Sequence, residues 1–261
     1  MPIELAYWNF RCLVGACKLL LEYVEADWTD RQYERFQNPD GTWDRSMWLQ
    51  VKESQSFQKD FAFPNLPYLT DGDVHLTQST TILKVRLFNL VDFRNLNFAL
   101  FQYIARKYKV GQKLTDTESW RVDLGCDQIT NVRDMFINFC YGVNPAIDFP
   151  FDQKDLFCND HLRPSLESLD RFMSGVDFVA GETITFVDFM FWEMLDQMEL
   201  FDSRLFDGLD NIKSYKARFA AVPKVKAYIT SDRFMTAPCN GKRAKWGGDK
   251  ELTCTWQSMV Q

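Results

Sequence analysis

The chain has 261 residues, of which 46% are apolar and 15% aromatic, and this is enough apolar side chain to fill the core of one large domain or two ordinary ones. Its formal net charge of −6 opposes the long-range attraction that a protein binding nucleic acid or an anionic membrane requires. The first ten residues lack the basic start and apolar run of a signal peptide, and no later stretch keeps roughly eighteen apolar residues together. We therefore expect a cytoplasmic protein with small-molecule or protein partners, and no nucleic-acid or membrane partner.

The seven cysteines are odd in number and include no C-x-x-C pair and no cysteine–histidine cluster at metal spacing. We expect them to be reduced, mostly structural thiols. His75 and His161 stand alone in the sequence, and we expect ordinary surface or loop histidines rather than catalytic bases. The sequence therefore predicts no metal site and no tightly bound cofactor.

The first hundred or so residues alternate between strand and helix signals. A strand is predicted over Ile3 to Tyr7 and a helix over Leu13 to Tyr23. The stretch from Pro64 to Leu76, which contains the turn Asp71-Gly72-Asp73, predicts a hairpin, and a helix should open at Gln78-Ser79. This alternation is typical of an α/β layer.

The second half of the chain carries helical signals instead. From Asp116 onward apolar residues recur at helical spacing, and the glycine-containing stretch Tyr108 to Lys113 predicts a linker before them. Thr185 and Asp188 have the spacing of a capping box and stand before an apolar run, so they predict the start of a buried helix. We expect an α/β domain over 1–109, an all-helical domain over 114–240 and a C-terminal tail over 241–261.

Six short motifs stand in order along nearly the whole chain. They are Tyr7 to Arg11, Leu19 to Tyr23, Asp44 to Trp48, Phe63 to Leu69, Gln78-Ser79, and Phe178 to Glu182 with Thr185 to Phe189. Each occurs by chance, but together and in register they resemble a mu-class glutathione transferase, and the turn-rich loop from Phe36 to Trp48 is similar to the extra loop of that class. The resemblance implies a thioredoxin-like N-terminal domain, an all-helical C-terminal domain and a homodimer.

The activity implied by the resemblance is conjugation of the thiolate of reduced glutathione to hydrophobic electrophiles, a detoxification reaction. A thiol has a pKa near 8.5 or above and is a poor nucleophile, so the chemistry needs a donor at the sulfur. Tyr7 resembles the family's catalytic tyrosine, and one hydrogen bond to the anion contributes about 1.5–3 kcal/mol. By itself Tyr7 would be interpreted as a core tyrosine at a strand end, but beside Trp8 and Arg11 the catalytic interpretation is favoured.

The resemblance also implies the residues that bind glutathione. Gln78 and Ser79 would hold the γ-glutamyl end at a helix start, where free N–H groups favour a carboxylate. The backbone of Leu66, before a cis Pro67, would pair with the cysteinyl part. The implied glutathione-binding set is Tyr7, Trp8, Arg45, Trp48, Lys52, Asn65, Leu66, Pro67, Gln78, Ser79 and Asn131.

Within this set Arg45, Trp48 and Lys52 would lie near the glycyl carboxylate, where cations and an indole N–H are useful. Asn131 stands where the family usually has an acid that reaches across the dimer, so a charge pair becomes at best a neutral hydrogen bond. Tyr141 resembles the tyrosine that faces the electrophile, although a core tyrosine is an equal alternative. We expect the surrounding electrophile pocket to be apolar.

Residues 85–102 are the largest departure from the family pattern. Removing them joins Lys84 to Tyr103 and restores a sequence that resembles a family helix. We hypothesise a short intron translated in frame, and the alternative is a genuine extended helix or lid. A looped-out insertion would expose its apolar residues, namely Phe88, Leu90, Phe93, Leu96, Phe98 and Phe101.

A smaller departure is Cys12, which stands where the family usually has glycine. A helix start can acidify a thiol and make it open to glutathionylation, but we favour an ordinary structural thiol. Two further functions stay open on the sequence. One is a non-catalytic carrier of glutathione or hydrophobic ligands, favoured by Asn131 and the interrupted helix. The other is an inactive mis-spliced product.

Overall fold

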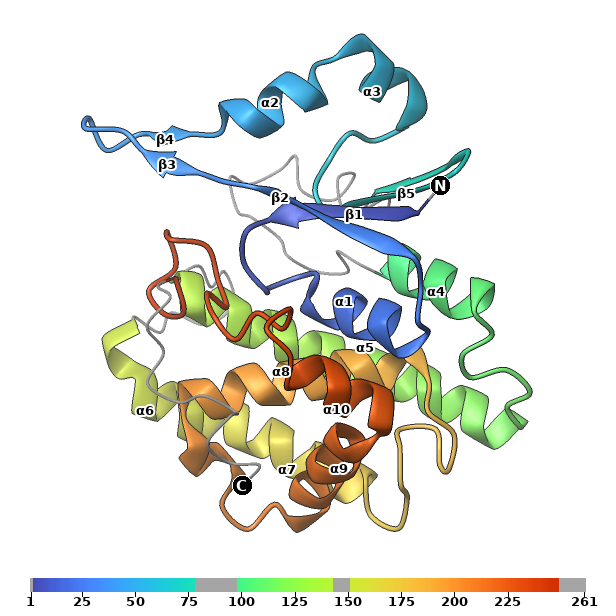
Figure 1. Cartoon of the computed structure of the whole chain (residues 1–261). Helices are drawn as coiled ribbons and strands as arrows, with labels where there is room; N and C mark the ends of the chain where they lie inside the picture. Colours follow the sequence, from blue (N-terminus) through green and yellow to red (C-terminus); the bar gives the residue numbers. More distant parts are fainter. Residues whose placement is uncertain (1, 78–97, 143–150, 249–261) are drawn as a thin grey trace.

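The computed structural model describes residues 2–77, 98–142 and 151–248. Gln78, Ser79, most of the hypothesised insertion and residues 249–261 lie outside the described residues. Figure 1 shows a small sheet with its own helices resting on a larger set of helices. The predicted order of an α/β domain followed by a helical domain is therefore present.

The sheet has four strands in the order β2-β1-β5-β6. Its central strand β1 (Ile3–Trp8) is apolar and mostly buried, and it runs parallel to β2 (Trp28–Tyr33) and antiparallel to β5 (Tyr68–Asp71). The hairpin partner of β5 is β6 (Val74–Thr77), as predicted. We did not predict β2, because it is an edge strand whose exposed polar residues carry no apolar alternation.

Helices cover both faces of this sheet. Figure 1 shows α2 (Ser46–Lys52) and α3 (Gln55–Asp60) on one face, and α1 (Gly15–Tyr23) and α4 (Phe98–Lys107) on the face toward the helical domain. A small hairpin precedes α2, and its strands are β3 (Phe36–Gln37) and β4 (Trp43–Asp44). The face that carries α1 and α4 is thus the one that joins the two domains.

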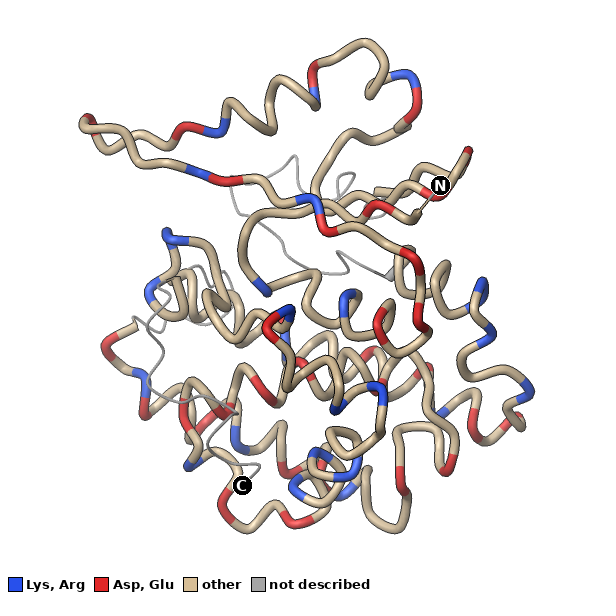
Figure 2. Tube along the Cα trace, in the orientation of Figure 1, with Lys and Arg blue, Asp and Glu red and all other residues tan. Residues whose placement is uncertain are grey.

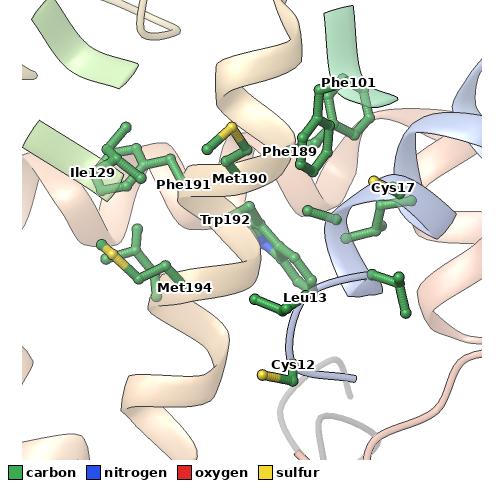
Figure 3. Close-up of a cluster of buried hydrophobic side chains, with 14 of the residues drawn as sticks. Cys12, Leu13, Cys17, Phe101, Ile129, Phe189, Met190, Phe191, Trp192 and Met194 are labelled. Atoms are coloured by element: carbon green, nitrogen blue, oxygen red, sulfur yellow. The ribbon is translucent and has the colours of Figure 1, made fainter. Parts of the chain in front are cut away.

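Helix α4 begins inside the segment that we hypothesised to be an insertion. Its Leu100 is 0% exposed and its Phe101 1% exposed, and Figure 3 shows Phe101 beside Phe189 of the helical domain. The expectation that Phe101 would be exposed is therefore wrong, because Leu100 and Phe101 supply core side chains rather than belonging to a loop. The origin of the segment stays a hypothesis, and its residues 85–97 lie outside the described residues.

The helical domain consists of one long and several shorter helices around a buried one. They are α5 (Asp116–Tyr141), a 3₁₀ turn at Phe151–Gln153, α6 (Lys154–Phe157), a π-helical turn at Cys158–Leu162, α7 (Arg163–Phe172), α8 (Phe186–Phe201), a 3₁₀ turn at Ser203–Phe206, α9 (Asp210–Ala221) and α10 (Pro223–Ile229). Every residue of α8 from Val187 to Met198 is buried, and Figure 3 shows Trp192 pointing from α8 toward Leu13. Helix α8 is thus the core against which the N-terminal domain packs.

The predicted capping box at the start of α8 is confirmed. The carboxylate of Asp188 accepts hydrogen bonds from the backbone N–H of Thr185 at 2.7 Å and from that of Val179 at 2.8 Å. Burial raises the pKa of Asp188 to about 6, although these hydrogen bonds act in the opposite direction. Asp188 therefore joins the first turn of α8 to the loop before it.

A buried ion cluster connects the two domains. Arg11, in the loop between β1 and α1, donates from Nε and Nη2 to the two carboxylate oxygens of Glu193 at 3.0 and 2.9 Å. Its Nη2 also donates to Asp196 at 2.6 Å, and Arg11 is only 2% exposed. Since both acids belong to α8, the cluster determines where the loop that follows β1 lies on the helical domain.

We predict that Glu193→Gln lowers the free energy of unfolding by about 2–4 kcal/mol, because it removes one charge of a buried, hydrogen-bonded group. The matched control is Glu167→Gln, since Glu167 pairs with Arg163 at 2.9 Å but its side chain is 45% exposed. That control should cost about 0.5 kcal/mol or less. Urea unfolding measures both, and equal losses would contradict the importance of the buried cluster.

Candidate active site

Tyr7 lies near the C-terminal end of β1, and its side chain turns into the interior. It is 5% exposed and packs edge to face on Phe10, with the ring centroids 5.2 Å apart. Its hydroxyl and the thiol of Cys12 lie close enough for each group to influence the pKa of the other. Burial, with Cys12 and Tyr141 as further causes, raises the pKa of Tyr7 well above its ordinary value. Tyr7 is therefore a protonated hydrogen-bond donor at neutral pH.

Cys12 has an unusual backbone conformation that the C-terminal part of the chain holds in place. Its φ is +21°, a value at which side chains other than glycine are strained. Its backbone N–H donates to the carbonyl of Cys239 at 2.8 Å, and that of Arg11 donates to Pro238 at 3.0 Å. These contacts place the Cys12 sulfur beside the hydroxyl of Tyr7.

The structure does not support the disfavoured alternative of an acidified Cys12. Burial raises the pKa of its thiol to about 12, and the nearby Arg133 and the hydrogen bond from Tyr7 only partly offset this. Helix α1 begins at Gly15, so Cys12 lies before the helix rather than in its first turn. Desolvation therefore outweighs any helix-dipole effect at this position.

Tyr141 is the last residue of α5. Its hydroxyl accepts a hydrogen bond from the backbone N–H of Gly241 at 2.8 Å. Further along the loop that contains Gly241, the backbone N–H of Lys245 donates a hydrogen bond to the carbonyl of Cys140 at 2.6 Å. Figure 1 shows the loop that follows α10 beneath the ribbon joining β2 to β3. The segment 241–248, which we assigned to a tail, is thus part of the site.

A cavity of about 320 Å³ opens between this loop and the end of β1. Its aromatic wall consists of Trp8, Phe10, Tyr33, Phe36 and Trp43. Three cations also line it, namely Arg35, Lys242 and Arg243, together with the single carboxylate of Glu34. The motifs did not point to these cations, because they come from a strand end and from the presumed tail. The basic pair Lys242-Arg243 was the only sequence signal for them.

The residues expected at the glycyl end of glutathione lie elsewhere, around α2. Arg45 is exposed directly before this helix, and Lys52 is its last residue. Trp48 is 5% exposed and packs within an aromatic cluster, stacking on Tyr68 at a centroid distance of 6.2 Å. Trp48 is therefore also a core residue of the N-terminal domain.

The remaining predicted residues fall into three places. The peptide bond between Leu66 and Pro67 is cis, as expected, with Asn65 directly before it. Asn131 is exposed on α5. Among the described members of the glutathione-binding set, Trp8 alone lines the cavity. The pairing of Ala6 with Tyr68 places the cis bond beside the end of β1, close to Tyr7 and Trp8.

Two further properties concern only residues 2–77, 98–142 and 151–248. Within these ranges no group of three or more His, Cys, Asp or Glu side chains is arranged to hold a metal ion. None of their helices combines the length and the apolar character needed to cross a membrane.

The fold and the tyrosine at the end of the first strand define the class of protein as a glutathione transferase. Residues 131–232 match the family model described as "Glutathione S-transferase, C-terminal domain". The chain is 35% identical over 243 residues to Glutathione S-transferase Mu 5 of Mus musculus, covering 93% of this chain and 95% of that protein. It is 36% identical over 243 residues to Glutathione S-transferase Mu 3 of Homo sapiens, covering 93% and 94%.

Solved structures agree with these sequence relatives. The crystal structure of the glutathione S-transferase Blo t 8 superposes with a TM-score of 0.73 at 25% identity, over 94% of this chain and 99% of that one. A pi-class glutathione S-transferase of Onchocerca volvulus superposes with a TM-score of 0.69 at 20% identity, over 94% and 100%, which shows the shared fold. The chain belongs to the mu class of the glutathione S-transferase family.

We predict that Cys12 of the native protein reacts with iodoacetamide at pH 7.5 at least about 100-fold more slowly than the thiol of free glutathione. The reason is that both burial and the raised pKa keep the thiolate scarce and inaccessible. Peptide mass spectrometry of samples quenched over time measures the rate. Rapid labelling of Cys12 in the folded protein would contradict this description of the site, and the denatured chain, in which Cys12 should label quickly, is the control.

Proposed function

We propose that this protein transfers the thiol of reduced glutathione to hydrophobic electrophiles, with Tyr7 as the hydrogen-bond donor to the sulfur. Membership of the glutathione S-transferase family makes the protein an enzyme of this class. The observation that supports the role of Tyr7 is that its hydroxyl is buried and protonated and lies close enough to the sulfur of Cys12 for each group to influence the pKa of the other. The site therefore has a protonated donor in the neighbourhood of a sulfur atom.

The proposed reaction begins when the glutathione sulfur replaces Cys12 as the acceptor of the Tyr7 hydrogen bond. A hydrogen bond to an anion is stronger than one to a neutral thiol, so the exchange favours the ionised form of glutathione. The thiol proton passes to water, the thiolate attacks the electrophilic carbon, and the leaving group departs with the electron pair of the broken bond. Tyr7 keeps its own proton throughout, since its raised pKa prevents it from acting as a base.

The remaining contacts to glutathione are proposed on the family resemblance. Arg45 and Lys52 lie at the two ends of α2, where they are available to a carboxylate. The backbone of Leu66, at the cis bond, would pair with the cysteinyl part like an added strand. Gln78 and Ser79 would complete the site at the γ-glutamyl end.

We also propose a cytoplasmic homodimer. Trp120 and Leu124, which are 52% and 54% exposed, lie one helical turn apart on α5, and Asn131 follows three turns after Trp120 on the same face. Exposed apolar side chains of this size favour burial against another chain. The resemblance places Asn131 at the subunit interface, which this face would provide.

The two rival functions receive less support. A non-catalytic carrier was favoured by an interrupted helix, yet α4 is a packed helix whose Leu100 and Phe101 lie in the core. The second rival, an inactive mis-spliced product, is likewise not favoured by the comparisons. The similarity to curated transferases over 93% of the chain favours the enzyme.

We predict that the protein conjugates glutathione to 1-chloro-2,4-dinitrobenzene and that Tyr7→Phe lowers kcat by about tenfold or more. Loss of the hydroxyl should raise the pKa of the bound glutathione thiol by about one to two units, because one hydrogen bond to the anion is missing. Thiolate absorbance near 240 nm, titrated against pH, measures that pKa. An active protein in which Tyr7→Phe leaves the pKa unchanged would remove Tyr7 from the proposed role.

The matched variant for this experiment is Cys12→Ala. It removes the sulfur that competes for the hydroxyl, so the Kd for glutathione should fall by about two- to tenfold, in keeping with one neutral hydrogen bond. Opposite effects of the two variants would separate the role of the donor from a general disturbance of the site.

We predict that Leu124→Arg shifts the protein from dimer toward monomer, because it places a charge in the apolar face of α5. Light scattering after gel filtration measures the mass. Leu156→Arg on α6 is the matched control, since Leu156 is 46% exposed but lies on a different helix. A wild-type protein that is monomeric at every concentration, or equal shifts in both variants, would contradict the proposed interface.

A further inference from the structure

The cavity beside Tyr7 differs from the apolar pocket expected for a hydrophobic electrophile. Its walls combine aromatic rings with the three cations Arg35, Lys242 and Arg243, against one carboxylate, that of Glu34. Glu34 accepts a hydrogen bond from the side chain of Asn9 at 3.4 Å. The cavity therefore carries an excess of positive charge in a protein whose net charge is −6.

Arg35 is the most constrained of the three cations. Its guanidinium carbon lies 4.6 Å from the ring centroid of Trp8 and 5.4 Å from that of Phe10, so the charge is held against the aromatic wall. Among the described residues no carboxylate forms an ion pair with Arg35, Lys242 or Arg243. Burial lowers the pKa of Arg35, and the like charges of Arg45 and Arg243 add to this effect. An anion at this point would relieve both the repulsion and the missing ion pair.

The backbone of the C-terminal loop is arranged to admit this guanidinium. A Cβ at Gly241 would lie 2.5 Å from Nη2 of Arg35 and 3.2 Å from the hydroxyl of Tyr141. Only glycine leaves both groups where they are. Gly241 thus lets Arg35 stand next to the tyrosine that we place near the electrophile.

The other two cations come from the same loop. Lys242 and Arg243 follow Gly241 directly, and both are exposed at the cavity. Figure 2 shows basic residues on this loop and on the ribbon that joins β2 to β3 above it. The cations therefore enter the cavity from two segments that are far apart in the sequence, which rules out a simple run of solvated charges.

We propose that this cavity selects planar electrophiles that carry a carboxylate, with Arg35 binding the carboxylate and the aromatic wall stacking on the ring. The proposal rests on the proposed function, because it names the substrate class of the same site. Arg35 also lies close enough to Tyr7 and Tyr141 to influence the pKa of both, so a substrate held by it would reach the sulfur. A neutral electrophile of the same shape would leave the cations unpaired.

The reaction with such a substrate is an ordinary aromatic substitution. The thiolate supplies the electron pair for a new C–S bond, chloride leaves with the pair of the broken C–Cl bond, and the thiol proton passes to water. The carboxylate takes no part in the bond changes. Its effect is on binding and orientation, where a charge-assisted bidentate contact with an arginine is among the stronger interactions available.

The experiment compares 4-chloro-3,5-dinitrobenzoate with its methyl ester, which has the same leaving group and ring but no charge. The kcat/KM of each, divided by its uncatalysed rate constant with glutathione, gives an acid-to-ester ratio. We expect the ratio to favour the acid in the wild type and to fall about tenfold in Arg35→Met. Added salt should also lower the ratio, because the cavity is open to solvent.

The matched control is Arg31→Met, which changes the net charge equally on β2 but lies outside the cavity, where Arg31 is 3.6 Å from Glu4. This control should leave the ratio unchanged. An acid-to-ester ratio near one in the wild type, or an equal fall in both variants, would overturn the proposal.

A second measurement separates this proposal from the proposed function. Calorimetry with the unreactive pair 3,5-dinitrobenzoate and its methyl ester needs no turnover. If the acid binds more tightly than the ester and this preference is lost in Arg35→Met, the anion site is supported. If, in addition, neither chlorinated substrate reacts, only the proposed transferase function fails. If the protein conjugates the neutral 1-chloro-2,4-dinitrobenzene but neither the kinetic nor the calorimetric comparison shows a preference for the acid, the anion site alone is overturned.

Discussion

The contact on which the site depends most is the buried pairing of Arg11 with Glu193 and Asp196. A buried guanidinium without its acids would be an uncompensated charge, so the loop after β1 has to lie where α8 presents them. Gly15 shows how close this approach is, because a Cβ there would lie 2.0 Å from Oε1 of Glu193. The two domains therefore meet at a distance that this cluster determines.

That position has consequences for the chemistry. Cys12 follows Arg11 directly, and its thiol lies close enough to the hydroxyl of Tyr7 for the two groups to influence each other's pKa. The same loop is held from the other side by the carbonyls of Pro238 and Cys239. The loop that follows Tyr7 in the thioredoxin-like domain is thus held in place by residues of both domains.

The C-terminal loop supplies further residues to the site. It bonds to Tyr141 through Gly241 and brings Lys242 and Arg243 to the cavity that Arg35 already lines. The acid-base properties follow from the same geometry, since burial keeps Tyr7 protonated while the nearby cations give the cavity its positive charge. The proposed donor for sulfur and the proposed anion site consequently lie side by side.

The sequence by itself determined the local features. The strand at Tyr7, the hairpin near Asp71 and the capping box of Thr185 and Asp188 were all predictable, because each depends on neighbouring residues. The register of the motifs also identified the family and the cis bond before Pro67.

Only the tertiary structure decided the long-range features. The raised pKa of Cys12 depends on burial by residues more than two hundred positions away, and the cationic cavity depends on Arg35 meeting a loop that sequence patterns assigned to a tail. The core position of Phe101 likewise depends on its partner Phe189 in α8. Desolvation and charge act through space, so no pattern of neighbouring residues could have shown them.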